Sequence, residues 1–258
     1  LMISTVASSD VRKYVGASDI VMMHSVADVQ GLNSITRTIL SNGAHALAGM
    51  VRSRQEARRK PVATEAKPAI GLTMFGVTTT AVQQITAQLK DDFDCLVFHA
   101  TGIGGQSMET LVDSGLISGV IDITTTEVCD MVAGGIFPAT EDRFGAMIRK
   151  RMPYIGSVGA LDMVNFGPPE TVPEKYRTRL FYRHNPQVTL MRTSVAENVE
   201  MGRFIASRLN EMEAPVRFFL PEGGVSALDK PGQPFFDPQA NDALFRTIEE
   251  NGRRTETR

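Results

Sequence analysis

The sequence of 258 residues contains no tryptophan, only two cysteines and no long apolar run. Two cysteines are too few for a disulfide-stapled scaffold, and they suit a reducing compartment. No stretch approaches the roughly 20 apolar residues that a transmembrane helix needs, and no signal-peptide pattern is visible. We therefore expect a cytoplasmic protein without a membrane partner.

Charge of one sign is also lacking, since 27 Lys and Arg stand against 29 Asp and Glu for a net charge of −2. Without a basic excess, nucleic acid is not expected to be the main partner. The hydrophobic fraction of 42% and the charged fraction of 22% are those of an ordinary globular protein. A chain of this length buries roughly 70–75% of its unfolded surface, so its core needs no staples.

One pattern occurs three times between residues 69 and 130. A short apolar run ends in a cluster of Thr, Gly or Ser, and a helical pattern follows. The runs begin at residues 69, 94 and 119, a spacing of 25 residues, which is filled by one strand, one turn and one helix. The repeat predicts an α/β fold with a mainly parallel, Rossmann-like sheet and helices on both faces. Further strands of this sheet are expected near 154–158 and 216–220.

The first quarter of the chain differs from this repeat. Two short strands are expected there, followed by a helix from Gly31 to about Val51. The stretch from Arg52 to Pro68 is basic and contains two prolines, which favours a solvated linker over a binding patch. We expect residues 1–60 to be the C-terminal part of a first α/β subdomain, and residues 61–258 to be a Rossmann-like subdomain that carries the ligand site.

Two features suggest a homodimer. The 31–51 helix is rich in Gly and Ala, which permits close approach of another helix, either from the same chain or from a second subunit. The segment 167–179 is rich in Pro and charge, and such long excursions are usually functional loops or packing arms. Either element could form the subunit contact.

The second apolar run ends at His99 and is followed by the glycine-rich turn 101–105. Glycines before a helix let the backbone approach an anion, and the helix N-terminus adds partial positive charge. The turn lacks the third small residue of the dinucleotide fingerprint, because position 107 is Ser, and it lacks the Lys of a P-loop. It predicts a phosphate site that uses neutral N–H donors. The alternative is a turn that only serves strand-to-helix geometry.

The carboxyl ends of parallel strands share one edge of a sheet, and ligands bind there. Several predicted strands end in hydroxyl-bearing or glycine residues, although Thr at a helix start is also an ordinary N-cap. The candidate ligand-binding residues are Gly76, Thr78, Thr79, Thr80, Thr101, Gly102, Gly104, Gly105, Thr124, Thr125, Thr126, Glu222, Gly223 and Gly224.

Three residues are candidates for acid–base catalysis. His99 ends a strand beside the glycines and could act as a base, or it could be a buried histidine bonded to backbone. Asp122 lies inside an apolar run, where a carboxylate must be paired. Glu127 has the spacing of a capping box with Thr124, which favours a cap over a catalyst. The histidines and cysteines show no metal-ligand spacing, and no motif names a reaction.

Seven segments together resemble one family, the widely distributed bacterial family that shares the ATP-binding domain of the tomato mosaic virus resistance protein. The segments are 4–8, 18–20, 31–33, 71–80, 99–105, 122–127 and 221–226. The resemblance covers essentially the whole chain. It implies a two-subdomain α/β fold, ATP as ligand with Mg²⁺, and a homodimer. Because members of the family are longer, we expect this chain to be a fragment.

Three functional interpretations remain open. The first is a nucleotide-binding protein whose glycine- and threonine-rich strand ends hold the phosphates of ATP. The second is an enzyme acting on a small phosphorylated or carboxylic metabolite, with His99 and a carboxylate as acid and base. The third is a dimeric interaction module without catalysis. The absence of a P-loop lysine weakens the first interpretation, because γ-phosphate chemistry usually has a charged partner.

Overall fold

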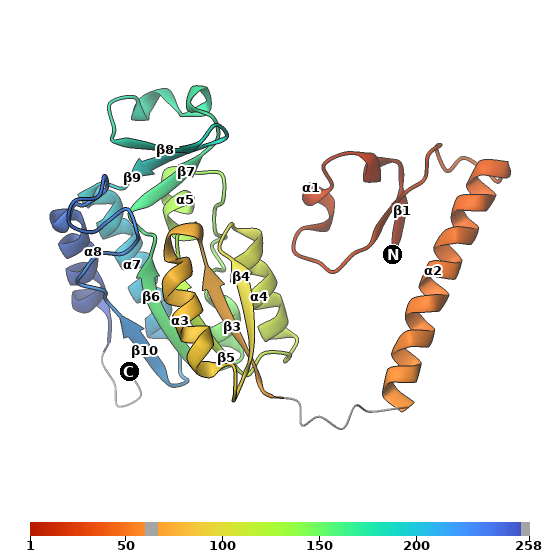
Figure 1. Ribbon diagram of the computed structural model, residues 1–258, viewed down its shortest axis with the longest axis horizontal. Coiled ribbons are helices and arrows are strands. Elements are labelled where there is room, and N and C mark those ends of the chain that lie inside the picture. Colours follow the sequence, from red (N-terminus) through yellow and green to blue (C-terminus); the bar gives the residue numbers. More distant parts are fainter. Residues whose placement is uncertain (60–66, 254–258) are drawn as a thin grey trace. The chain divides into compact units, whose positions relative to one another are not determined.

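The computed structural model describes residues 1–59 and 67–253 (Figure 1). The chain divides into two compact units, Leu1–Ala66 and Lys67–Arg258, here called the N-terminal unit and the C-terminal unit. The C-terminal unit contains a five-stranded parallel sheet surrounded by helices, which confirms the predicted α/β class.

The N-terminal unit consists of a long helix and a two-stranded parallel sheet. Its elements are β1 (Met2–Ser4), α1 (Arg12–Val15), β2 (Met22–His24) and α2 (Ser34–Arg59), with a 3-10 helix at Thr5–Ser8. The side chain of Asn33 starts α2 by accepting hydrogen bonds from the N–H groups of Ile35 and Thr36. The prediction that residues 52–59 belong to a linker is wrong, because Arg, Gln, Glu and Ala are good helix formers and no Gly or Pro interrupts them.

The parallel sheet has the strand order β10-β6-β5-β3-β4. Counted along the chain from β3, this is the doubly wound order 2-1-3-4-5 read from the β4 edge. Its strands confirm the sequence prediction closely. They are β3 (Ala69–Met74), β4 (Asp94–His99), β5 (Gly119–Thr124), β6 (Tyr154–Gly159) and β10 (Val216–Phe219).

Helices cover both faces of the sheet, as predicted. On one face Val82 of α3 packs with Leu72 of β3, and on the other Met108 of α4 packs with Val120 of β5. Successive residues of a strand point to opposite faces of the sheet. Gly71, next to Leu72 in β3, accordingly faces Met108 of α4, because a Cβ at Gly71 would contact that side chain. The helices are α3 (Thr79–Leu89), α4 (Ile103–Asp113), α5 (Glu127–Ala133), α6 (Gly145–Arg149), α7 (Val195–Glu211) and α8 (Pro238–Asn251).

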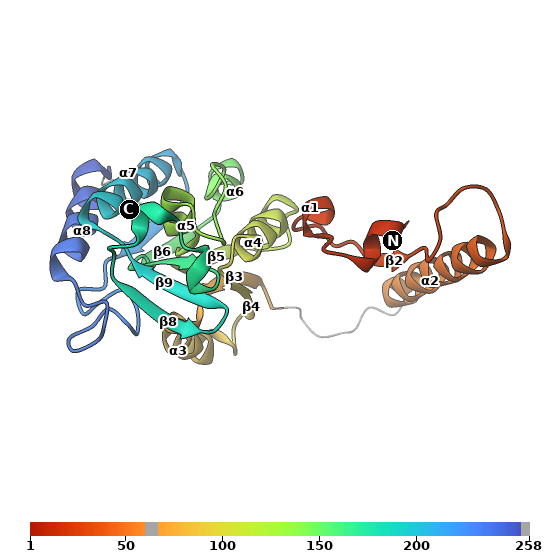
Figure 2. The same cartoon turned by 90° about the horizontal axis from the view of Figure 1, so that it is seen from above.

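A small antiparallel sheet follows β6 and lies beyond the carboxyl ends of the parallel strands (Figures 1 and 2). Its order is β7-β9-β8, with β7 at Met163–Phe166, β8 at Phe181–Asn185 and β9 at Val188–Arg192. Two 3-10 helices lie between β7 and β8, at Pro169–Thr171 and Glu174–Tyr176. The β8 strand was not predicted, because it is short and its last three residues are exposed and polar.

The helical sequence pattern of residues 141–151 forms only a short helix in the structure. It spans only Gly145–Arg149, because the preceding residue, Phe144, has a left-handed backbone with φ of 72°. This turn places Arg143, which lies just before it, inside the core with 3% of its surface exposed. The irregular start of α6 is therefore what carries an arginine into the buried region described below.

Candidate functional site

The carboxyl ends of β3 and β4 form an open edge of the sheet. The two strands are in register, with Met74 opposite His99, and the N–H of Ala100 donates to the Met74 carbonyl at 2.7 Å. The rings of Phe75 and His99 meet edge to face, with centroids 5.3 Å apart. His99 is exposed, so the alternative of a buried structural histidine is wrong.

The glycine-rich turn is held by hydrogen bonds to the side chain of Glu127. Its Oε1 atom accepts hydrogen bonds from the N–H groups of Gly102, at 2.7 Å, and of Gly105, at 3.1 Å. Gly102 has φ of +75°, which favours glycine. A Cβ at Gly105 would overlap Glu127 Oε2. Two of the N–H groups predicted to bind phosphate are therefore occupied by a carboxylate of the protein itself.

Two other backbone N–H groups at this edge form no hydrogen bond with the described part of the chain. Within the described part of the chain, the N–H groups of Gly76 and Gly104 have no hydrogen-bond partner. Gly76 is exposed and Gly104 half-buried. A Cβ at Gly76 would meet nothing within 4 Å, whereas one at Gly104 would overlap the carbonyl oxygen of His99. Glycine at 104 is thus required for the turn itself, while the backbone at Gly76 is open to a ligand.

Glu127 belongs to a buried cluster of three carboxylates around Arg143. Arg143 Nε donates to Glu127 Oε2 at 3.1 Å, and Nη1 donates to Glu109 Oε1 at 2.9 Å. Its Nη2 donates to both oxygens of Asp122, at 2.9 and 2.7 Å. Asp122 also accepts from Tyr154 Oη at 3.1 Å and from Thr73 Oγ1 at 2.6 Å. We call Arg143, Glu109, Asp122 and Glu127 the Arg143 cluster.

Burial and ion pairing shift the pKa values of the Arg143 cluster in opposite directions. It raises the pKa of Glu109 and of Glu127, and the positive charge of Arg143 opposes that rise. Burial lowers the pKa of Arg143, but Asp122, Glu127 and Glu109 together raise it well above its usual value. Asp122 and Glu127 have no exposed surface, so the structure gives both a structural contact and neither a path to a ligand.

The two threonine triplets have mostly internal partners. Thr124, Thr125 and Thr126 are fully buried, and Thr124 Oγ1 lies 2.7 Å from Thr78 Oγ1. The hydroxyls of Thr125 and Thr126 donate to main-chain carbonyls. The predicted capping box between Thr124 and Glu127 is wrong, since Thr126 is the N-cap of α5 and Glu127 bonds the glycine turn. The capping-box spacing does form at Ser194 and Glu197.

The turn 222–224 lies apart from the other predicted residues. It follows β10, the edge strand opposite β4, and four strand spacings amount to roughly 19 Å. A cavity of about 530 Å³ opens there, lined by Glu222, Gly223, Gly224 and residues of α8 such as Arg246. The structure thus separates the candidate residues into an open edge at β3 and β4 and a cavity at β10.

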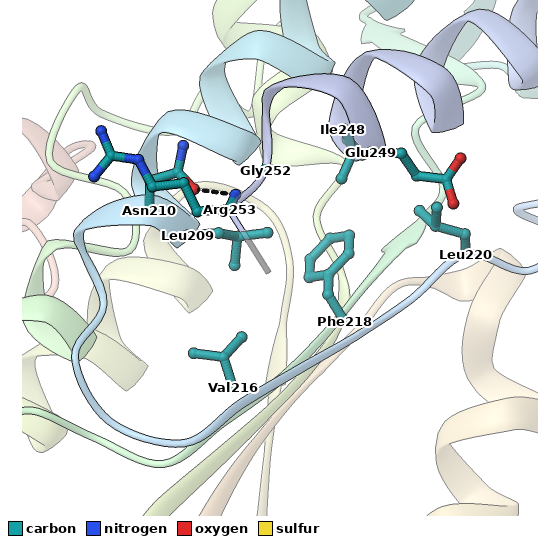
Figure 3. A pocket seen from close by; sticks show the side chains of 9 residues that line it. All are labelled: Leu209, Asn210, Val216, Phe218, Leu220, Ile248, Glu249, Gly252 and Arg253. Atoms are coloured by element: carbon teal, nitrogen blue, oxygen red, sulfur yellow. Dashed lines mark hydrogen bonds between the residues drawn. The ribbon is translucent and has the colours of Figure 1, made fainter. Parts of the chain in front are cut away.

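A second cavity lies beside β10, between the C-terminal ends of α7 and α8 (Figure 3). Its volume is about 330 Å³ and its lining is mainly apolar, with Leu209, Val216 and Phe218. The Arg253 N–H donates to Asn210 Oδ1 at its rim, at 2.7 Å. None of the predicted ligand residues faces this pocket.

In residues 1–59 and 67–253, no group of three or more His, Cys, Asp or Glu side chains is arranged to hold an ion. The same part of the chain has no helix with the length and apolarity to cross a membrane.

Sequence reasoning missed the central residue, Arg143, together with Glu109 and Tyr154. Both Arg143 and Glu109 lie in segments with helical patterns, where a charged side chain is ordinarily solvated. The available signal was Asp122, because a carboxylate in a buried strand requires a partner. That signal implied a buried cation without saying where in the chain it lies.

The family of the chain follows from its match to two family models. Residues 67–258 match the C-terminal domain, and residues 1–56 the N-terminal domain, of the family described as "Uncharacterised protein family (UPF0261)". The chain belongs to this family. The recognised resemblance is confirmed.

Several relatives extend beyond this chain. It is 59% identical over its whole length to "UPF0261 protein RA0729" of Rhizobium meliloti, of which it covers 63%. It is 47% identical to a UPF0261 protein of Clostridium tetani, of which it covers 61%. It is 48% identical over 250 residues to the tomato "ToMV resistance protein Tm-1(GCR237)", of which it covers 33%. The chain thus spans less than two thirds of these relatives.

Proposed function

We propose that this chain is part of a nucleotide-binding protein, and that ATP binds with Mg²⁺ at the open edge formed by the ends of β3 and β4. The observation that carries the proposal is the pair of unpartnered N–H groups at Gly76 and Gly104. Gly76 follows Phe75, whose ring meets that of His99, and Gly104 lies against the His99 carbonyl oxygen. Backbone N–H groups at strand-to-helix turns are a common way to hold phosphate.

Each part of the ligand has a matching group at this edge. The phosphates accept from the Gly76 and Gly104 N–H groups, and the base stacks beside the Phe75 and His99 rings. No Lys or Arg occurs in residues 75–80 or 99–105, so the protein supplies neutral donors only. Mg²⁺ therefore enters with the phosphates and balances their charge.

The test removes one N–H group without adding bulk. Gly76→Pro deletes the donor at the first position of a 3-10 helix, where Pro is well tolerated, and the extended backbone of Phe75 suits a following Pro. Gly76→Ala keeps the donor and places its Cβ in open space. We expect Gly76→Pro to weaken MgATP binding by about tenfold or more, while Gly76→Ala binds like the wild type in calorimetric titrations.

The result also separates the competing interpretations. Equal MgATP affinity in both variants would refute the open edge as the site. Binding of small carboxylic or phosphorylated acids, but not of MgATP, at a site sensitive to Gly76→Pro would favour the metabolite enzyme with His99 as its acid–base group.

The free thiols of Cys95 and Cys129 suit a reducing compartment, and we propose that the protein is located in the cytoplasm.

A second candidate, the homodimer, is favoured by the surface of α2. Leu40, Leu47 and Val51 are each between 37% and 49% exposed, and with Ala44 they recur every three to four residues along one stripe. Such a stripe fits a second copy of the same helix packed against it. We propose that α2 forms the subunit contact.

Sedimentation of the full chain tests this contact. The double variant Leu40→Ser, Leu47→Ser should shift the protein toward monomer, whereas Asn42→Ser, at an exposed polar position of the same helix, should not. A wild type that sediments as a monomer at micromolar concentration would refute the dimer.

A further inference from the structure

Glu127 joins two parts of the C-terminal unit that are distant in sequence. Its Oε1 atom accepts from Gly102 and Gly105 in the turn before α4, and its Oε2 atom accepts from Arg143 Nε before α6. Both oxygens of one carboxylate are therefore used, one on the turn and the other on the cation. The position of the turn depends on where this carboxylate is held.

Arg143 holds the carboxylate at a fixed point relative to the sheet. Its guanidinium contacts both oxygens of Asp122, and Asp122 is a residue of β5 in the middle of the sheet. A guanidinium is planar and presents its donors in a rigid fork. Once Nη2 is bound to Asp122, the direction of Nε, and with it the position of Glu127, follows.

The packing leaves Glu127 little freedom to move. Its side chain has no exposed surface, and a Cβ at Gly105 would overlap its Oε2 atom. Releasing the carboxylate would leave a charge and two N–H groups buried without partners, which is costly. The carboxylate is therefore a fixed support of the turn and is not displaced by an incoming anion.

We infer that Arg143 and Glu127 are positioning residues, which set the direction of the Gly104 N–H and hence the geometry of the nucleotide site without touching the ligand. This inference rests on the proposed function for its consequence in binding. The ordering of the turn by Glu127, however, can be measured without any ligand. Glu109 provides a matched control. It bonds Arg143 Nη1 and the N–H groups of Phe144 and Ala146, but it makes no hydrogen bond to the turn.

The experiment compares Glu127→Gln with Glu109→Gln in the full chain, using hydrogen exchange of the 99–108 peptide and MgATP titration. The amide of the Glu127→Gln variant has only one acceptor oxygen, because its nitrogen can only donate. It can therefore accept hydrogen bonds from the turn or from Arg143, but not from both. We expect amide exchange at Gly102 and Gly105 to accelerate about tenfold or more in Glu127→Gln, with MgATP affinity lowered about tenfold. Glu109→Gln should leave both quantities unchanged, and circular dichroism should show both variants folded.

The outcomes distinguish the two ideas. Unchanged exchange in a folded Glu127→Gln overturns the positioning role, whatever happens to binding. Faster exchange with unchanged MgATP affinity shows that Glu127 orders the turn and that the nucleotide does not use it, which overturns the inferred effect on the site. Equal effects of Glu109→Gln and Glu127→Gln would assign both changes to a general loosening of the Arg143 cluster. If Glu127→Gln fails to fold, Glu127→Asp, which keeps the charge but shortens the reach, is subject to the same two criteria.

Discussion

The two units of the chain differ sharply in how they are packed. In the C-terminal unit, one hydrophobic core packs α4, α5, α7 and α8 against the sheet, and a second packs α3 against its other face. Among residues 1–59 whose side chains are described, only Ser25, Thr36 and Gly43 are buried. The 26-residue α2 has two of these. A unit whose apolar residues remain exposed gains little from folding by itself, because burial of apolar surface is the main driving force.

The polar groups show the same difference. The C-terminal unit buries Arg143 among three carboxylates and Arg192 beside Asp229, which requires a core that is already well packed. The described arginines of α2 lie at its exposed surface. From this comparison we expect the C-terminal unit to fold by itself and the N-terminal unit to be unstable by itself.

The largest expected effect comes from separating the units. A fragment of residues 67–258 should unfold cooperatively on heating, as expected for a domain with its own core. A fragment of residues 1–66 should show no cooperative transition at low micromolar concentration, because a two-stranded sheet and one helix bury too little surface. Circular dichroism on heating measures both. A cooperative transition in the shorter fragment would contradict the comparison.

Next in size is the effect of Arg143→Ala. Removing the guanidinium leaves three buried carboxylates without their cation, and we expect a loss of about 3–5 kcal/mol in the free energy of unfolding. The control is Arg149→Ala, whose partners Asp113 and Asp142 are at the surface, and whose loss should be below about 1 kcal/mol. Urea titration gives both values. Equal losses of unfolding free energy in the two variants would show that burial does not make the Arg143 ion pairs more important for stability than surface ion pairs.

A pH effect of intermediate size should appear in the C-terminal unit. Burial raises the pKa of Asp130 and of Asp162 from 3.8 to about 7. The folded state therefore holds these protons more tightly than the unfolded state. Their contribution to stability is fully present near pH 4 and is lost as the pH rises to about 7, by at most about 4 kcal/mol for each group.

Asp162→Asn tests this assignment. The Asp162 carboxylate accepts from Ser226 Oγ at 2.7 Å, and an amide oxygen can accept the same bond. The variant should remove part of the stability loss between about pH 4 and pH 7 in urea titrations. An unchanged pH dependence would show that Asp162 does not titrate in this range.

The smallest expected effect is that of Leu47→Ala in α2. Leu47 is 49% exposed, so in the monomer its truncation should change the free energy of unfolding by less than about 0.5 kcal/mol. Leu72→Ala, at a fully buried position of β3, should cost about 2–5 kcal/mol. A large destabilisation of the monomer by Leu47→Ala would mean that the N-terminal unit is packed more tightly than its exposure indicates.

Much of the fold could be predicted from the sequence, because its signals are local. The runs that begin at residues 69, 94 and 119 are strands, since apolar residues bounded by Gly and Thr favour buried parallel strands. The Ser194–Glu197 capping box marks the start of α7 for the same reason. The short β8 strand and the late start of α6 were missed, because exposed polar residues and the positive φ of Phe144 leave no periodic signal.

The sequence by itself determined which residues can end a strand at an open edge: glycines where the chain turns tightly, and His99 beside them. Only the tertiary structure decided which of these groups are free. Glu127 occupies two of the N–H groups of the glycine turn, the second threonine triplet is buried, and residues 222–224 lie at the far edge of the sheet. The physical reason is that hydrogen-bond partners of buried groups come from distant parts of the chain, so Arg143 and Glu127 meet through packing and not through spacing.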